Sequence, residues 1–306
     1  MTHTFTIDGK QRTCLGYVPN RLTGAPALVI VLHGSSINGA TMRKWTGFGF
    51  DRLADRYGFV VAYPDGYKGN WNDCRMDASF PAKTEQIDDV AFMQALIDYY
   101  STTYHTDRRK VFVFGYSNGG QMAMRLAMET PQLVSAIAAV CANLPVPESC
   151  SCPAYGATPR VMLVAGDQDE INPYAGGDVR LFGFMKRGMA VSAAATAQYF
   201  ARRNGIAAAE APIQWPRKDN SDPTFITAQN WMQGDIPFVT SYTVHGGGHT
   251  VPQPDFEFPQ FLGATSRNLD APVAAVFFFG LSPMPDEERP GGAPLLPGEE
   301  TPRNDF

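Results

Sequence analysis

The sequence has little of what defines several large classes of protein. No apolar stretch approaches the roughly 20 residues that a membrane-spanning helix needs. Basic residues are outnumbered by acidic ones, 25 Lys and Arg against 30 Asp and Glu, and the formal net charge is −5. These deficits argue against a membrane partner and against the basic surface that a nucleic acid or an anionic lipid requires.

Cysteine is scarce and its count is odd. With five cysteines, at least one has no disulfide partner in the same chain, which favours a reducing compartment. Cys150 and Cys152 are separated by one residue, an unusual spacing for a mutual bridge, and no further ligands follow at the spacing of a zinc site. We expect buried or partly exposed thiols with room for one disulfide.

The N-terminus also lacks a recognisable export signal. MTHTFTIDGK has neither the basic start nor the apolar run of a signal peptide. A secreted protein from which the signal had been removed would look the same, so cytoplasmic and secreted locations both stay open. The 306 residues, of which 44% are hydrophobic, are enough to bury a sizeable core.

Short apolar runs alternate with helical segments along the chain. Most of these runs lack period-2 alternation, as expected of strands that are covered on both faces. The predicted strands span 27–34, 59–64, 111–115, 134–140, 160–166 and 238–244, and the predicted helices span 45–57, 88–103, 118–129, 192–204 and 271–279. This order predicts an α/β fold with a mostly parallel sheet and helices on both faces. Asp8-Gly9 predicts an antiparallel hairpin before it.

The chain is expected to form one domain. Residues 1–280 carry the predicted α/β domain, and residues 281–306 read as a tail rich in Pro, Gly and acidic residues. Two loop-rich stretches, 65–86 and 207–237, are longer than a plain α/β unit needs. Long loops in a compact domain are often functional, so we expect both at the rim of a cleft.

The segment VFVFGYSNGG, residues 111–120, ends a predicted strand with a serine among glycines. Gly115, Gly119 and Gly120 permit the cramped strand-to-helix turn of a G-x-S-x-G nucleophile elbow. The alternative is that Ser117 merely caps the following helix. An elbow predicts Ser117 as a nucleophile, with an acid and then a histidine later in the chain.

A carboxylate-rich loop follows the predicted strand 160–166. Asp167, Asp169 and Glu170 lie in DQDEINPY, and one of them has to accept the second N–H of a histidine ring. Asp169 is favoured, because Asp167 directly follows the strand and is suited to cap the turn.

A histidine-containing loop, HGGGHTVP, follows the predicted strand 238–244. His249 is favoured as the general base over His245, which abuts the strand. A zinc site built from both histidines lacks an accompanying ligand pattern. Because the carboxyl ends of parallel strands meet at one edge, Ser117, Asp169 and His249 are predicted to lie together.

An elbow also needs two backbone N–H groups that bind a negatively charged oxygen. Asn118 follows the nucleophile and supplies the first. VLHGSS follows an early strand and supplies the second through the amide of Ser35 or, less favourably, of Ser36. His33 is predicted to organise this turn rather than to catalyse.

Trp71 is an aromatic candidate for the binding cleft. In GNWND, its indole either forms a rim on which a sugar or an aromatic acyl group packs, or fills the base of a loop. The sequence leaves both alternatives open.

Several of these motifs occur together in one family. LHGSS, YPDGYKGNWNDC, IDDVAFM, GYSNGG, GDQDEINPY and GGGHTVP resemble the poly(3-hydroxybutyrate) depolymerase-like esterases, α/β-hydrolases related to the feruloyl and acetylxylan esterases of carbohydrate esterase family 1. The resemblance runs from Val29 to Pro252. Aligned on NPY, Asp169 takes the acid position, and His249 matches the base of the family motif GGGHTWP. The departures at Ala165 and Val251 bear on the pocket wall and hence on the substrate.

The resemblance implies an α/β-hydrolase that cleaves carboxylic esters through an acyl-enzyme, with no metal or organic cofactor. The expected substrates are small soluble esters or oligomers, either feruloyl and acetyl esters of carbohydrates or hydroxyalkanoate oligomers. An acyltransferase of the same fold, a peptidase and a non-catalytic binding protein are the alternatives. The oligomeric state stays open.

Overall fold

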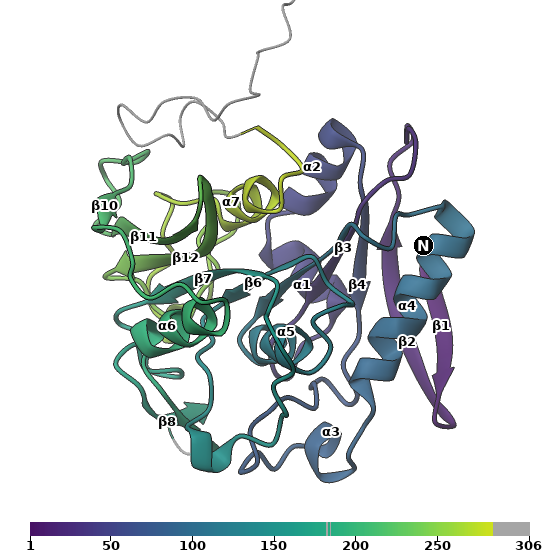
Figure 1. Ribbon diagram of the computed structural model, residues 1–306, viewed down its shortest axis with the longest axis horizontal. Helices are drawn as coiled ribbons and strands as arrows, with labels where there is room; N and C mark the ends of the chain where they lie inside the picture. Colours follow the sequence, from purple (N-terminus) through teal and green to yellow (C-terminus); the bar gives the residue numbers. More distant parts are fainter. Residues whose placement is uncertain (182, 184, 284–306) are drawn as a thin grey trace, which may run out of the picture.

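The computed structural model describes residues 1–181, 183 and 185–283, which fold around a ten-stranded sheet (Figure 1). Its parallel part consists of β4 (Val60–Pro64), β3 (Leu28–Leu32), β5 (Val111–Tyr116), β6 (Ala136–Val140), β7 (Arg160–Gly166) and β12 (Ile236–His245), in this spatial order. The five-residue strands β3, β4 and β6 are buried at every position, as the unbroken apolar runs predict. The mostly parallel sheet is thereby confirmed.

Antiparallel strands extend the sheet at both ends. At one end, β1 (Thr2–Ile7) and β2 (Lys10–Tyr17) form the predicted hairpin, whose turn residues Asp8 and Gly9 have φ of 46° and 70°. At the other end, β11 (Phe225–Gln233) and β10 (Ile213–Gln214) add two strands.

The strand β11 corrects the prediction of a long loop over 207–237. Its side chains alternate between buried and partly exposed, and it carries polar residues such as Gln229 and Asn230. A strand of this kind has no continuous apolar run, so a search for such runs passes over it.

Helices cover both faces of the sheet, as predicted (Figure 1). The helices α1 (Gly39–Trp45), α2 (Gly49–Tyr57) and α7 (Ala271–Phe278) pack on one face, and α4 (Asp89–Tyr104), α5 (Asn118–Glu129) and α6 (Ala193–Arg203) pack on the other. The single helix expected over 45–57 is wrong at its start. Gly47 and Phe48 have φ of 59° and 57°, which interrupts the helical path between α1 and α2.

The segments after the strands carry smaller elements. The stretch 65–86 contains the one-turn helix α3 (Pro81–Thr84), and a separate hairpin of β8 (Gly177–Leu181) and β9 (Met185–Ala190) follows β7. Two short 3-10 turns span Pro147–Ser149 and Gln260–Leu262.

One disulfide, Cys74–Cys152, ties the stretch 65–86 to the segment after β6. Cys14 and Cys141 are buried free thiols, and Cys150 is partly exposed. The chain therefore uses the one disulfide for which the sequence left room. A disulfide is typical of oxidising compartments, which weighs against the reducing compartment that the odd cysteine count favoured.

The predicted tail, 281–306, lies outside the described residues from 284 onward. Leu281 still packs against the hydrophobic core beside α7. In the described part of the chain, no helix combines the length and the apolar character that a membrane span requires.

Candidate active site

Ser117 lies on a tight turn between β5 and α5. Its φ of 53° and ψ of −118° fall outside the regions that L-residues favour, so its backbone is strained. The turn depends on glycine at two places: a Cβ on Gly119 would lie 2.4 Å from the Leu32 carbonyl oxygen, and one on Gly115 would lie 2.2 Å from the Gly119 oxygen. Within the described residues the Ser117 side chain makes no capping bond to α5, so the helix-cap alternative is wrong.

The three residues predicted to act together are in contact. His249 Nε2 lies 2.9 Å from Ser117 Oγ, and His249 Nδ1 lies 2.7 Å from Asp169 Oδ2. The side chains of His249 and Asp169 are only 4% and 1% exposed. One buried imidazole thus connects the hydroxyl of the partly exposed Ser117 to a buried carboxylate.

The Asp169 carboxylate is held in place by the backbone of its own loop. Its Oδ1 accepts the N–H groups of Ile171 at 2.9 Å and of Asn172 at 2.8 Å. The other oxygen, Oδ2, faces His249. This arrangement favours the ring form with a proton on Nδ1, which leaves Nε2 free to accept a proton from Ser117.

A second Asp-His pair lies nearby and contains the residues that the sequence disfavoured. Asp167 Oδ2 is 3.0 Å from His245 Nδ1, and Asp167 Oδ1 accepts the N–H of Gly246. The His245 ring stacks on Phe225 and contacts Thr227, both on β11. This pair therefore fastens the turn after β12 to β11, and the third acid candidate, Glu170, is exposed.

The two predicted amide donors flank Ser117. The amide of Ser36 donates to the Gly69 oxygen at 2.8 Å, so it is engaged elsewhere and Ser35 is left as the candidate. A Cβ on Gly34 would lie 3.3 Å from Ser117 Cβ, which places the Ser35 loop against the serine. Asn118 begins α5, where the first N–H groups of a helix have no intrahelical acceptor.

The side chain of Asn118 has a second role that the sequence did not reveal. Its Oδ1 accepts the Trp71 N–H at 2.7 Å, while its Nδ2 donates to the Trp71 oxygen at 3.0 Å and to Asp73 Oδ2 at 2.7 Å. The residue beside the nucleophile therefore holds the stretch 65–86 in position. No local signal could have found this, because the partners lie more than forty positions away along the chain.

The rim position considered for Trp71 is wrong. The side chain is fully buried, and its Nε1 donates to the His33 oxygen at 2.9 Å. It fills the base of the loop, which was the other alternative. Val251 is also fully buried, in the core beneath the site, so its difference from the family's tryptophan lies inside the protein and not on an open pocket wall.

His33 organises the turn, as predicted. Its Nε2 accepts the Gly66 N–H at 2.8 Å, and its Nδ1 donates to the Gly34 oxygen at 2.6 Å. Burial lowers the pKa of His33 to about 4. The neutral ring thus joins the Ser35 loop to the start of the stretch 65–86.

Tyr116, the residue before the nucleophile, was missed by the sequence reasoning. Its hydroxyl donates to the His249 carbonyl oxygen at 2.7 Å, and its ring lies 5.3 Å from the imidazole. Phe258 packs against Tyr116 and Trp45. This aromatic cluster supports the loop that carries His249.

The site offers one grouping of potential metal ligands. Ligand atoms of Cys141, Asp169 and His249 lie within 4.8 Å of one another. However, Asp169 and His249 bond each other, and the Cys141 thiol donates to the Thr250 oxygen. Burial raises the pKa of Cys141 well above its ordinary value, which disfavours the thiolate that a metal needs. We therefore assign no metal to these residues.

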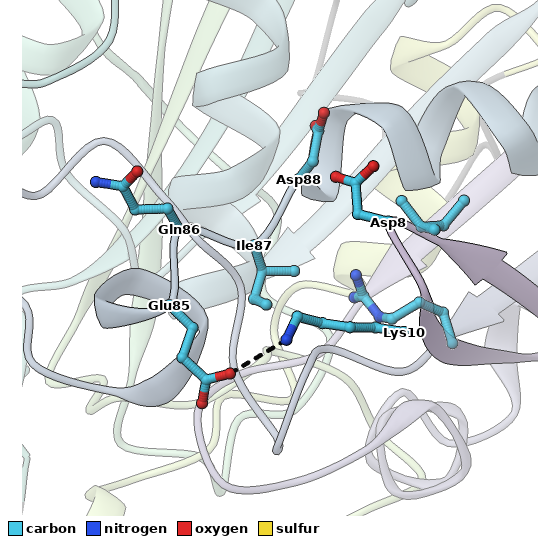
Figure 2. Close-up of a pocket in the computed structure, with 8 residues that line it drawn as sticks. Asp8, Lys10, Glu85, Gln86, Ile87 and Asp88 are labelled. Carbon is cyan, nitrogen blue, oxygen red and sulfur yellow. Dashed lines mark hydrogen bonds and ion pairs between the residues drawn. The ribbon is translucent and has the colours of Figure 1, made fainter.

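A pocket elsewhere on the molecule is separate from this site. Figure 2 shows it between the β1–β2 turn and the segment before α4, lined among others by Asp8, Lys10, Glu85, Gln86, Ile87 and Asp88. Lys10 and Glu85 form an ion pair of 3.4 Å across it. Its lining includes neither Ser117 nor His249, so we do not place the substrate there.

Comparison with known proteins gives two kinds of match. The model of the dienelactone hydrolase family matches residues 19–179, and the putative esterase NocK of Nocardia uniformis subsp. tsuyamanensis is 30% identical over 274 residues, 83% of this chain and 76% of that protein. Feruloyl esterase B of Neurospora crassa is 32% identical over 146 residues, which cover 47% of each chain. The chain thus spans less than half the length of that esterase.

A solved structure extends the likeness to the whole fold. The acetyl xylan esterase from Aspergillus awamori superposes with a TM-score of 0.61, covering 92% of this chain and 100% of that one, at 18% identity. At this identity the match shows the fold alone, which is the α/β-hydrolase fold.

Proposed function

The chain belongs to the dienelactone hydrolase family and is a carboxylic ester hydrolase, and we propose that it works through a covalent acyl-enzyme on Ser117. The observation that carries the proposal is the continuous path of hydrogen bonds from Ser117 through His249 to Asp169. The strained backbone of Ser117 supports it, because such strain presents the hydroxyl at the edge of the sheet.

In the first step, Ser117 Oγ attacks the ester carbonyl carbon while His249 Nε2 takes the hydroxyl proton. The amides of Ser35 and Asn118 stabilise the oxygen that becomes negative. His249 then returns the proton to the alcohol oxygen as the carbon–oxygen bond breaks. The alcohol leaves, and the acyl group stays on Ser117.

In the second step, water takes the place of the alcohol. His249 removes a proton from the water as it attacks the acyl carbon, and later returns that proton to Ser117 Oγ. The carboxylic acid leaves and the free hydroxyl is restored. Asp169 stabilises the protonated ring in both steps.

For the substrate, we propose acetyl or feruloyl esters of carbohydrates. The names of similar proteins support this class, since they include a feruloyl esterase and acetylxylan esterases. Hydroxyalkanoate oligomers are the second candidate, favoured by the motifs GYSNGG and GGGHTVP. All of these substrates need the same catalytic centre, so measurement has to decide among them.

The test is product release measured by chromatography. Methyl ferulate, an acetylated xylo-oligosaccharide and a soluble 3-hydroxybutyrate trimer are supplied at equal concentration, with Ser117→Ala as the blank. We expect free acid from at least one substrate with the wild type and none with the variant. Wild-type activity in Ser117→Ala would refute the mechanism, and esters formed with an added alcohol in preference to free acid would favour acyl transfer.

A further inference from the structure

Arg187, on β9, is a buried cation whose side chain has no hydrogen-bond or ion-pair partner among the described residues. The residue is 8% exposed, and its Nε is fully buried without a hydrogen bond. Throughout the described residues, no carboxylate forms an ion pair with it. Among the described residues, its one specific side-chain contact is with an aromatic ring, since the guanidinium lies 5.4 Å from the centre of the Phe80 ring. A buried charge normally has a counter-ion, so this one indicates a group that the protein alone does not supply.

The buried carboxylate that acts on Arg187, Asp73, already has hydrogen-bond partners. Asp73 is fully buried and bonds Arg75 through two oxygens, with Arg75 Nε 3.1 Å from each. Asp73 Oδ2 also accepts from Asn118. Asp77, on the same stretch, is exposed and accepts the Ser149 hydroxyl.

The cluster formed by Asp73, Arg75, Phe80 and Arg187 therefore holds more positive than negative charge. Arg75 and Arg187 both lie over Phe80, and in the described part of the chain Asp73 is the one buried carboxylate that bonds Arg75 or acts on Arg187 through its charge. Burial, and then the charge of Arg75, lower the pKa of Arg187 from its usual value. An arginine nevertheless stays protonated, because its ordinary pKa is above about 12.

The cluster lies at the same edge of the sheet as the nucleophile. The stretch 65–86 follows β4, and the β8–β9 hairpin follows β7. A backbone bond from Val146 to Met189 joins the hairpin to the segment after β6. Because the carboxyl ends of parallel strands share one edge, both segments leave the sheet at the edge that carries Ser117. Contacts run from Asn118 through Asp73 to Arg75, and Arg75 lies over the same Phe80 ring as Arg187.

We propose that Arg187 forms a subsite for a carboxylate carried by the ester substrate, at the far end from the bond that is cleaved. The guanidinium presents paired N–H groups that suit a planar carboxylate, and the buried setting strengthens such a bond. The carboxylate would supply the charge that the cluster lacks. This subsite rests on the proposed function, since it selects among esters that reach Ser117.

The test uses pairs of esters that differ only in charge. Mono-p-nitrophenyl esters of dicarboxylic acids with four to eight carbons carry a carboxylate on the acyl side, and acetyl esters of ω-hydroxy acids carry it on the alcohol side. Each is compared at pH 7 with its methyl-capped neutral form. We expect kcat/KM for one chain length to favour the charged form by about tenfold, the effect of one charged hydrogen bond.

Two variants separate the subsite from general charge effects. Arg187→Met keeps a long side chain over Phe80. It should reduce the preference for the charged ester from about tenfold to about one and leave kcat/KM for p-nitrophenyl acetate unchanged. Arg187→Lys should restore part of it. Lys186→Met removes an exposed charge from the same hairpin and should leave the preference intact. Thermal unfolding confirms that each variant is folded.

Each outcome decides the proposal. No wild-type preference for a charged ester in either series would overturn it, as would a preference that persists in Arg187→Met. A rise in the unfolding temperature on adding acetate or phosphate that is lost in Arg187→Met, without any substrate preference, would mean that a small free anion is the counter-ion and would also overturn the proposal. Absence of all activity towards p-nitrophenyl acetate would instead refute the proposed function.

Discussion

Tyr116 and His249 are joined by a hydrogen bond of 2.7 Å from the tyrosine hydroxyl to the histidine carbonyl oxygen. Tyr116, the residue before the nucleophile, therefore fixes the backbone of His249, which is proposed to take the proton from Ser117. The bond is buried and spans 133 positions of sequence. Together with the bond between His249 and Ser117, it sets the distance between the end of β5 and the loop that carries His249.

Replacing Tyr116 by phenylalanine is expected to slow catalysis without unfolding the protein. The variant keeps the ring but leaves the His249 carbonyl without its donor, which costs about 1 kcal/mol or about a fivefold loss in kcat. The measurement is kcat with p-nitrophenyl acetate, alongside thermal unfolding. Tyr17→Phe is the matched control, because that hydroxyl bonds Asp55 at the surface. Equal kcat in both variants would mean that the bond does not position His249.

The two Asp-His pairs allow the acid to be identified directly. Asp169→Asn should lower kcat by about 10⁴-fold, because an amide no longer holds the ring with its proton on Nδ1. Asp167→Asn removes the same charge from the neighbouring pair and should change kcat only a few-fold, because His245 contacts Thr227 and Phe225 and not Ser117. The reverse pattern would assign the acid to Asp167.

The disulfide is expected to stabilise the fold and the site together. The double variant Cys74→Ser/Cys152→Ser should lose about 2–5 kcal/mol in the free energy of unfolding, measured with urea. Cys74 follows Asp73, which bonds Asn118, so kcat should fall as well. Cys150→Ser, which removes a free thiol from the same segment, is the control. A double variant as stable as the control would contradict this prediction.

Acid should destabilise the protein through His33. Its pKa is about 4 in the folded protein, against about 6.5 in the unfolded chain. Between these values the unfolded chain binds a proton that the folded protein does not, so the free energy of unfolding falls as pH decreases from 6.5 to 4. The loss is up to about 3 kcal/mol and is absent above pH 6.5.

The His33 contribution is isolated by comparing variants. In His33→Gln the advantage of the wild type should shrink as pH falls through this window, as followed by urea unfolding. His105→Asn, at an exposed helix end with φ of 57°, should leave the pH dependence unchanged. A constant difference between the wild type and His33→Gln at all pH values would contradict the assignment.

The features that the sequence predicted are those fixed by local physics. The buried strands β3, β5 and β7 appear as apolar runs because both faces are covered. The elbow could be predicted from the sequence because the backbone approaches Gly115 and Gly119 too closely for any side chain at these positions. The choice of Asp169 over Asp167 followed from its distance to the strand end, and the structure brings Asp169 to His249.

The features that were missed depend on partners far along the chain. Trp71 could be either a rim or a plug until its contact with His33 was known, and the β11 strand is recognisable only beside β12. Arg187 looks like any surface arginine in the sequence. Its burial comes from the packing of the β8–β9 hairpin on the stretch 65–86, which no local pattern reports.

The side chain of Asn118 has a consequence for how this site can evolve. Its amide group lies beside the nucleophile and bonds a distant segment through both of its polar atoms. Oδ1 accepts the main-chain N–H of Trp71, and Nδ2 donates to the Trp71 oxygen and to the Asp73 carboxylate. A change at either partner leaves the other with a mismatched donor or acceptor. The stretch 65–86 and the elbow are therefore free to diversify only as a pair.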